Sequence, residues 1–380
     1  MFFRCRCIQR MLSHHIAYHL KRRNKGPSRR YKYGNYAINK YLVTAEQLGI
    51  RVTPLGGGLY ELSNGHTTRR LMSNLCMDKE NVVTYKICGS KYLTYELLLH
   101  AGIRHIPKHQ LYTFRDIDRT CKDFQNWNCP VVIKPCSGTS GGNGVTVNIK
   151  SIKELRNAIC ESFVFDREAF LMEQFIEGAH YRVVTLKGEF LVCCHRTPAR
   201  IIGNGRDSVE TLIQNENERR SRDESEKALW PILVDNEVRR KLQSMDKSMA
   251  TVLKADEELY VRDAINFHAG GELRRVECVS EDIKSTCRRI AEVLDIYLAG
   301  FDIITPDIGR PFAETNGVIN EVNTSPGLQN MFTLREDGTE VHIAEIVLCD
   351  MFALRPCHAR VSGKSAATAV PRTVVTPRRT

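Results

Sequence analysis

The sequence predicts an α+β protein, which could also be described as α/β, because strand and helix patterns alternate along most of its 380 residues. Two stretches carry this prediction. Residues 129–149 have the pattern of a buried strand, a glycine-rich loop and an alternating strand, CPVVIKPCSGTSGGNGVTVNI. Residues 299–328 are typical of two strands joined by a turn, AGFDIITPDIGRPFAETNGVINEVNTSPGL. Antiparallel strand pairs packed against helices are therefore expected.

Four regions are predicted along the chain. We expect a basic, disordered arm in residues 1–39 and a small α/β domain in residues 40–128. That domain would include a helix at Lys91–Ile103, where apolar residues recur at helical spacing and a glycine follows. Residues 129–354 would form the main α+β body. Residues 355–380, rich in Ala, Thr, Ser, Pro and Arg, are expected to be a disordered tail.

The formal charge of +11 is concentrated at the two ends of the chain. Residues 1–45 contain 11 Lys and Arg, and residues 355–380 contain 6, with no Asp or Glu in either stretch. This leaves 38 basic and 44 acidic side chains in residues 46–354. A basic binding face is therefore not expected on the folded part, and nucleic acid is not predicted as a partner. No apolar run reaches the ~18 residues that cross a bilayer, so no membrane partner is predicted either.

The 14 cysteines do not form CxxC pairs and are not accompanied by His at zinc spacing. No secretory signal is apparent, so reduced thiols and a cytoplasmic location are expected. The basic, acid-free residues 1–45 also match a mitochondrial transit peptide, a disordered arm or sequence upstream of the true start, and these alternatives stay open.

The second strand of the 299–328 pair carries two oxygen ligands. Glu321 and Asn323 are two residues apart, so they should face the same side of the strand. A paired strand could bring Asp302 beside them. Three hard oxygen ligands on one rigid surface suit Mg²⁺ that bridges nucleotide phosphates. The alternative for such a pattern is a solvated face of a hairpin.

The glycine-rich loop does not match the common nucleotide motifs. The GxxxxGK[ST] and GxGxxG patterns are absent. Residues Gly138–Gly142 match GxSxG, but a hydrolase nucleophile needs a helix after the turn, and here a strand pattern follows. Ser140 is therefore not predicted to be a nucleophile. Small residues in such a loop expose backbone N–H groups that can close over phosphates.

Two weaker patterns follow the loop. Ser151 and Glu154 have the spacing of a capping box at the start of a helix. Phe175 and Ile176 stand at a strand end, where they could wall an adenine while backbone groups bind its edge. By itself, this second pattern indicates only the end of a strand.

Three arginines, Arg182, Arg196 and Arg200, follow on strands or strand ends. A guanidinium fork matches the two oxygens of a carboxylate or phosphate, although a surface salt bridge is the alternative for each. Residues 208–247 are charged and helical and are expected to form a surface excursion. Residues 259–277 are strand-like around a Gly-Gly turn.

Six motifs in order resemble those of the ATP-grasp ligases, and most of all the ATP-grasp region of cyanophycin synthetases and bifunctional glutathione synthetases. The resemblance covers residues 85–330 and rests on KYLTYELLLHAGIRHIP, VVIKPCSGTSGGNGVTVNI, EQFIEGAHYRVV, HRTPARIIGNGRDSVETLI, VRDAINFHAGGEL and FDIITPD with VINEVNTSPG. It implies the ATP-grasp fold, in which two α+β subdomains within residues 129–354 grip ATP after a small N-terminal domain.

The resemblance implies a role for each motif. Lys91 and Lys134 would reach the nucleotide phosphates, and Arg262 would stabilise the transferring phosphoryl group, so Lys134 and Arg262 are the implied catalytic residues. Arg182 and Arg196 are the candidates for the substrate carboxylate. The implied ATP-binding residues are Lys91, Lys134, Gly138, Gly141, Gly142, Glu173, Gln174, Phe175, Ile176, His180 and Asn266. The implied ligands of Mg²⁺, or of Mn²⁺ in its place, are Asp302, Glu321 and Asn323.

Two positions depart from the family pattern. His180 stands where the family usually has an acid for the ribose hydroxyls, although an imidazole can also form a hydrogen bond with a hydroxyl. His268 and Ala269 stand where Ser-Thr normally precedes the two glycines, which removes two hydroxyls near the phosphates.

The function implied is that of an ATP-dependent carboxylate–amine ligase that works through an acyl phosphate. Its partners would be ATP, a carboxylate and an amine, supplied by amino acids or a peptide. Family members often pair, which makes a homodimer an alternative to a monomer. A kinase-like phosphotransferase and a non-catalytic nucleotide-binding regulator are the competing functions. If the basic arm is separate from the ATP site, deletion of residues 1–45 should leave ATP binding unchanged.

Overall fold

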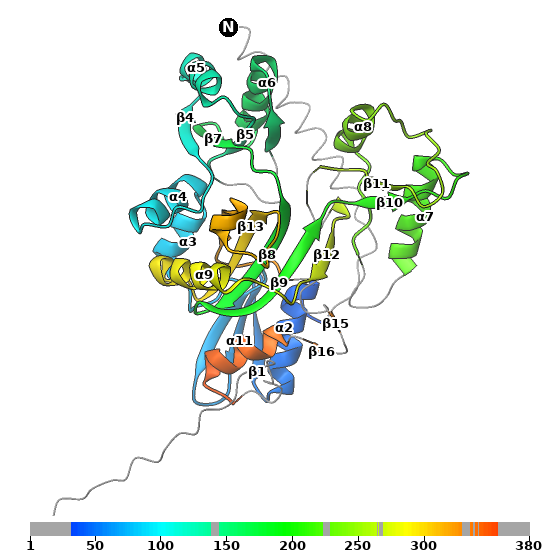
Figure 1. Cartoon of the computed structure of the whole chain (residues 1–380). Helices are drawn as coiled ribbons and strands as arrows, with labels where there is room; N and C mark the ends of the chain where they lie inside the picture. Colours follow the sequence, from blue (N-terminus) through cyan, green and yellow to red (C-terminus); the bar gives the residue numbers. More distant parts are fainter. Residues whose placement is uncertain are drawn as a thin grey trace, which may run out of the picture.

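The computed structural model describes residues 32–137, 144–222, 229–263, 265, 269–328, 335–336, 339–340 and 342–355. It confirms the predicted α+β class, because helices pack on sheets whose described strand pairs are all antiparallel. A five-stranded sheet lies at the centre of the molecule, and three smaller modules surround it (Figure 1).

The N-terminal module begins earlier than the sequence predicts. The Asn35 side chain accepts hydrogen bonds from the amides of Ala37 and Ile38 and so caps the first described helix. The predicted boundary between residues 39 and 40 therefore falls inside a helix. The elements of this module are α2 (Tyr36–Gln47), β1 (Arg51–Gly56), β2 (Leu59–Ser63), β3 (Thr68–Met72) and the late helix α11 (Ile343–Phe352). They share one hydrophobic core with an end of the central sheet.

The second module is a four-stranded sheet with the order β4-β7-β5-β6. Its elements are β4 (His109–Thr113), α5 (Ile117–Trp127), β5 (Val131–Pro135), β6 (Thr146–Ile149), α6 (Ile152–Phe163) and β7 (Ala169–Gln174). Strands β5 and β6 pair antiparallel, which confirms the predicted strand–loop–strand, and Ser151 and Glu154 form the predicted capping box. The predicted domain boundary at residues 128 and 129 cuts this sheet, because β4 pairs with β7 from much later in the chain.

The central sheet has the order β12-β9-β8-β13-β14. Its strands are β8 (Ala179–Leu186), β9 (Glu189–Thr197), β12 (Glu272–Arg275), β13 (Leu298–Thr305) and β14 (Val318–Asn323). One face packs on a core that includes α4 (Lys91–His100) and α9 (Glu281–Leu294), close to α3 (Val82–Cys88) and α10 (Phe312–Thr315). The other face is covered at one end by the N-terminal module, and its remaining part carries the polar side chains described below.

The predicted excursion at residues 208–247 belongs to a fourth module with a hydrophobic core of its own. Its elements are β10 (Arg200–Ile202), α7 (Val209–Arg222), α8 (Asn236–Gln243) and β11 (Glu258–Tyr260). The strands on either side of the Gly-Gly sequence do not pair with each other. Strand β11 pairs with β10, whereas β12 pairs with β9 of the central sheet. A short pair, β15 (Arg335–Glu336) and β16 (Thr339–Glu340), completes the described strands.

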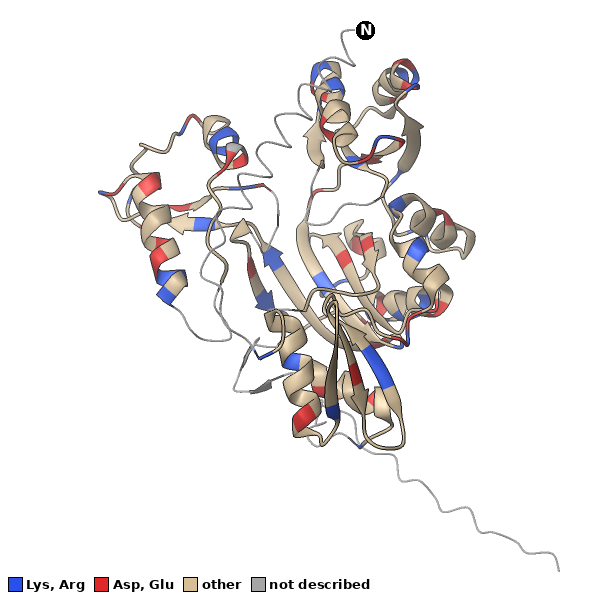
Figure 2. Ribbon diagram, turned by 180° about the vertical axis from the view of Figure 1, so that it is seen from behind, with Lys and Arg blue, Asp and Glu red and all other residues tan. Residues whose placement is uncertain are grey.

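Basic and acidic residues are interspersed over all the modules (Figure 2). Many of them form ion pairs, including an internal network in which Glu272 binds both Arg200 and Arg220. Among the described residues, no helix has the length and apolar character needed to cross a membrane.

Candidate active site

The polar face of the central sheet brings together the three predicted metal ligands. Asp302 on β13 lies directly opposite Glu321 on β14, and Asn323 lies opposite Gly300. Directly opposed residues of an antiparallel pair share a face, as do residues two apart on one strand. The predicted arrangement of Asp302 beside Glu321 and Asn323 is therefore confirmed. The Asn323 side-chain amide donates to the Gly300 carbonyl at 3.4 Å.

Two arginines hold Asp302. Arg182 on β8 approaches with Nε at 2.5 Å from Oδ1 and Nη2 at 3.1 Å from Oδ2. Arg196 on β9 adds an Nη1–Oδ1 contact of 2.9 Å. Burial alone would raise the pKa of Asp302, but the two guanidinium groups outweigh it and hold that pKa below its usual value. These arginines, predicted to bind a substrate carboxylate, bind a carboxylate of the protein here.

Lys91 begins α4 next to the loop that follows β5. The Ser90 side chain caps the helix, and the Lys91 amide donates to the carbonyl of Cys136 at 3.2 Å. The Lys91 ammonium lies 3.5 Å from Glu321 Oε1. This lysine therefore lies beside Cys136, just after β5, and beside one of the predicted metal ligands.

Lys134 on β5 is buried and pairs with Glu173 on β7, with Nζ and Oε1 at 2.6 Å. Burial lowers the pKa of Lys134, whereas Glu173 opposes that change. Lys91 and Glu321 also act electrostatically on Lys134, so the two predicted phosphate lysines lie in one cluster. Glu173 was predicted to help bind ATP. In the structure its carboxylate is the counter-ion of Lys134.

The predicted adenine-binding segment at the end of β7 is partly used by the protein itself. The Gln174 amide donates to the Lys108 carbonyl at 2.8 Å, and the Phe175 amide donates to the Pro130 carbonyl at 2.9 Å. The side chains of Phe175 and Ile176 are half-buried. An adenine placed here would therefore meet the apolar side chains and the backbone groups that follow Phe175.

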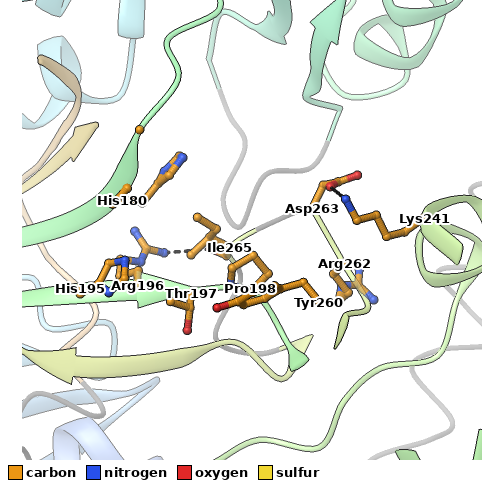
Figure 3. A pocket seen from close by; sticks show the side chains of 12 residues that line it. His180, His195, Arg196, Thr197, Pro198, Lys241, Tyr260, Arg262, Asp263 and Ile265 are labelled. Carbon is orange, nitrogen blue, oxygen red and sulfur yellow. Dashed lines mark hydrogen bonds and ion pairs between the residues drawn. The ribbon is translucent and has the colours of Figure 1, made fainter. Parts of the chain in front are cut away.

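A pocket of about 370 Å³ opens between the central sheet and the fourth module (Figure 3). His180 and Arg196 lie on one side of it, and Lys241 and Asp263 face each other on the opposite side, paired at 2.5 Å. Burial lowers the pKa of His180 to about 4, so this imidazole is neutral near pH 7. Tyr260 lies between the two sides (Figure 3).

Arg262 lines the same pocket but is held by acidic partners. Its guanidinium donates to the Leu233 carbonyl at 2.7 Å, to Asp235 at 3.1 and 3.2 Å, and to Glu237. Asp235 is the N-cap of α8, and Glu237 lies in its first turn. Arg262 thus anchors the start of α8. In this arrangement its charge is neutralised, which does not fit the predicted contact with a transferring phosphoryl group.

No protein-family model matches the chain. It is 29% identical over 298 residues to the cyanophycin synthetase of Geminocystis herdmanii, covering 77% of this chain and 33% of that protein. It is 26% identical over 272 residues to the bifunctional glutathione biosynthesis protein of Clostridium perfringens, covering 70% of this chain and 34% of that protein. The chain therefore spans about a third of the length of these relatives.

The crystal structure of a bifunctional glutathione synthetase from Pasteurella multocida superimposes with a TM-score of 0.59. The match covers 83% of this chain and 44% of that one, at 21% identity. The chain has the ATP-grasp fold. The fold predicted from the six motifs is thereby confirmed.

The donor chemistry of the polar face of the central sheet fits a divalent cation. Asp302 and Glu321 offer carboxylate oxygens and Asn323 an amide oxygen, which are the ligand types that Mg²⁺ and Mn²⁺ accept. Within the described residues, no group of three or more His, Cys, Asp and Glu side chains forms a metal cluster, so the amide would have to complete the set. A cation would also have to compete with Lys91, Arg182 and Arg196 for the carboxylates, as described above.

Several predicted ATP-binding residues lie outside the described part of the ATP-grasp chain. These are Gly138, Gly141, Gly142 and Asn266. Ser140 and His268 are also outside it. Sequence reasoning missed Tyr95, whose hydroxyl lies 3.4 Å from the Lys134 ammonium. Its position four residues after Lys91 on a predicted helix puts both side chains on one face, and that spacing was the available signal.

Proposed function

We propose that the chain is an ATP-dependent ligase that joins a carboxylate to an amine through an acyl phosphate. The observation that carries the proposal is the meeting of Lys91, Lys134 and the Asp302–Glu321 pair in one charged cluster. These groups come from two different sheets and the helix between them. An ATP-grasp fold with cations and hard oxygen ligands at this place suits a bound nucleoside triphosphate with its metal.

The charged side chains of this cluster form ion pairs with one another, and these pairs indicate how the cluster would bind ATP. Glu321 is paired with Lys91, Glu173 with Lys134, and Asp302 with the two arginines. A metal–nucleotide complex brings both a cation for carboxylates and anions for ammonium groups. We propose that Lys91 and Lys134 turn from carboxylates to phosphates as Asp302, Glu321 and Asn323 take the metal. The bound metal would supply charge neutralisation and would align the phosphate oxygens.

The chain's own groups would then act mainly by position and charge. In the proposed reaction, an oxygen of the substrate carboxylate attacks the γ-phosphorus of ATP, and the bond to the leaving ADP oxygen breaks. The amine then attacks the acyl carbon of the acyl phosphate, and inorganic phosphate leaves as the amide forms. Lys134 and Lys91 would hold the phosphate oxygens in line and balance their charge. The neutral His180 could bind a ribose hydroxyl without adding charge.

The pocket beside Arg196 is our candidate for the substrates. Arg196 reaches Asp302 with one amino group and the Ile265 carbonyl with the other, so it joins the metal face to the pocket. A volume of about 370 Å³ suits a small ligand such as an amino acid or the end of a peptide. We predict that the carboxylate and the amine come from amino acids or a peptide. A homodimer and a cytoplasmic location are also predictions.

The test is an incubation of the full chain with ATP, Mg²⁺ and mixed amino acids, with phosphate release and amide products followed by mass spectrometry. A ligase releases phosphate only when a carboxylate and an amine are both present, and it yields a product lighter by water than their sum. A stable phosphorylated product with the carboxylate alone would favour a kinase-like phosphotransferase. ATP binding with no turnover of any pool would favour a nucleotide-binding regulator.

A further inference from the structure

Tyr95 is a buried residue of α4 that contacts both halves of the proposed ATP site. Its side chain is fully shielded from solvent. Its hydroxyl donates to the carbonyl of Asn320 on β14 at 2.5 Å and accepts a hydrogen bond from the ammonium of Lys134 at 3.4 Å. Strand β14 belongs to the central sheet and Lys134 to the four-stranded sheet. One hydroxyl therefore bridges the strand that carries Glu321 and the strand that carries Lys134.

The contacts of Lys134 restrict the direction of its ammonium. An ammonium has three N–H donors and no acceptor. The ammonium forms an ion pair with Glu173 at 2.6 Å and donates a hydrogen bond to the Tyr95 hydroxyl. The Lys134 nitrogen also lies 5.5 Å from the centre of the Tyr95 ring, within the range of a cation–π contact. When Lys134 turns from Glu173 to a phosphate, the contact with Tyr95 remains and limits the directions of the other two N–H groups.

The Tyr95 ring is itself fixed by its surroundings. It packs against the His109 ring with centroids 4.8 Å apart, and it belongs to the core between α4, α9 and the central sheet. His109 lies opposite Glu173 in the pairing of β4 with β7. A ring held in this way keeps its hydroxyl in place when Lys134 changes partner.

We propose that Tyr95 is a positioning residue for Lys134, which fixes the ammonium relative to the Glu321 strand so that it meets an ATP phosphate. The inference rests on the proposed function, because it takes Lys134 to be a phosphate ligand. Tyr95 does not touch the nucleotide in this account. It acts through Lys134 and through the backbone of Asn320.

The test compares Tyr95→Phe with a matched control, Tyr112→Phe, in the full chain. Tyr112 is also buried in the core of the four-stranded sheet, and its hydroxyl donates to the partly exposed Asp123 at 2.8 Å. Both variants keep the ring and lose one buried hydroxyl, so their melting temperatures should fall by similar amounts. Calorimetry of ATP binding with Mg²⁺ should show a Kd about tenfold higher for Tyr95→Phe, the value of one hydrogen bond to a charged group.

The two variants should also differ in kinetics. Lys134 would hold phosphate before and during transfer, so Tyr95→Phe should raise the KM for ATP more than it lowers kcat, while Tyr112→Phe changes neither. Equal ATP affinity in Tyr95→Phe and wild type would overturn the inference. A similar loss of affinity in both variants would also overturn it, because the effect would then come from general destabilisation. Wild-type protein that binds no ATP would overturn both this inference and the proposed function.

Discussion

Arg182 and Asp302 form a two-point ion pair across the neighbouring strands β8 and β13. The two residues are directly opposed in the sheet, and both oxygens of the carboxylate are bound by the one guanidinium. Arg196 adds a third contact from β9. A carboxylate bound in this way is not available to a lone cation, so we expect metal and nucleotide to bind together rather than one after the other.

The first prediction concerns the stability that this pair provides. Arg182→Met should lower the free energy of unfolding by about 3 kcal/mol, because it leaves a nearly buried carboxylate with one fewer partner. Urea unfolding measures the loss. Arg288→Met is the control, since Arg288 makes a similar two-point contact with Glu189 but both side chains are exposed. The loss for Arg288→Met should be much smaller, because solvent screens an exposed ion pair. Equal losses would show that the Arg182–Asp302 pair contributes no more than a surface pair.

The second prediction concerns the proposed metal ligands. Glu321→Gln and Asn323→Ala should each abolish Mg²⁺-dependent ATP turnover while the chain stays folded, since one preorganised contact at such a site is worth on the order of 10²–10³ in rate. They should also weaken the increase in ATP affinity that Mg²⁺ produces, which calorimetry measures without any turnover. Glu314→Gln is the control. Glu314 lies on the connection between β13 and β14, where its half-exposed side chain pairs with Arg310. Normal turnover in both site variants would contradict the metal assignment.

The third prediction uses the titration of His180. The folded chain holds its pKa near 4 through burial, whereas an unfolded chain has a His pKa of ~6.5. Protons therefore bind the unfolded chain more tightly, and stability should be lost as the pH falls from ~6.5 toward 4. Other groups titrate in the same range. The measured quantity is therefore the difference in the free energy of unfolding between wild type and His180→Asn. That difference should shift by about 3 kcal/mol in favour of the variant between pH 7 and pH 4.

Urea unfolding of both proteins over this pH range checks the third prediction. His66→Asn, at an exposed turn, is the matched control. Parallel pH profiles for wild type and His180→Asn would show that His180 is hydrated in solution. In that event, the proposal that a neutral His180 binds the ribose would lose its basis.

The fourth prediction separates two roles for Arg262. If it anchors α8, Arg262→Gln should lower the free energy of unfolding by about 3 kcal/mol. Glu237→Gln, which removes one of its partners, should lower stability in the same direction. ATP turnover at a temperature where both variants are folded should then fall by less than about tenfold. A fall on the order of 10²–10³ in Arg262→Gln alone would instead restore the predicted contact with the phosphoryl group.

The parts of the site that sequence could predict are those set by local periodicity. Alternation along β14 places Glu321 and Asn323 on one side, and the loop between β5 and β6 is bounded by recognisable strand patterns. The capping box of α6 is likewise a matter of residues three apart. The six motifs also occur in the same order as in the ATP-grasp ligases. The fold could therefore be inferred before any strand pairing was known.

The parts that sequence could not predict depend on which distant groups meet. Arg182 and Asp302 are 120 residues apart in the chain, so nothing local distinguishes an arginine that binds substrate from one that binds the protein. Arg262 meets its acids across 25 and 27 residues. The pairing of β4 with β7, which moved a domain boundary, is of the same kind. Residue type alone gives the chemistry of such groups but not their partners.

The last prediction concerns the N-terminal module, for which the structure reverses an expectation from sequence. Deletion of residues 1–45 was expected to leave ATP binding unchanged. It would remove most of α2, whose Ile38, Tyr41 and Leu42 are fully buried against the core that also holds α11 and one end of the central sheet. We therefore expect the chain lacking residues 1–45 to be strongly destabilised and to lose ATP binding, since exposing such a core costs several large apolar side chains at once.

A shorter deletion provides the matched comparison. Removal of residues 1–31 keeps all of α2 together with the Lys32–Glu46 ion pair, so that chain should melt and bind ATP as the full chain does. Thermal unfolding and calorimetry of the two deletions measure the difference. Normal ATP binding by the chain that starts at Glu46 would mean that the ATP-binding sheets fold without the N-terminal module. The shared core of α2, α11 and the central sheet would then contribute little to the stability of the site.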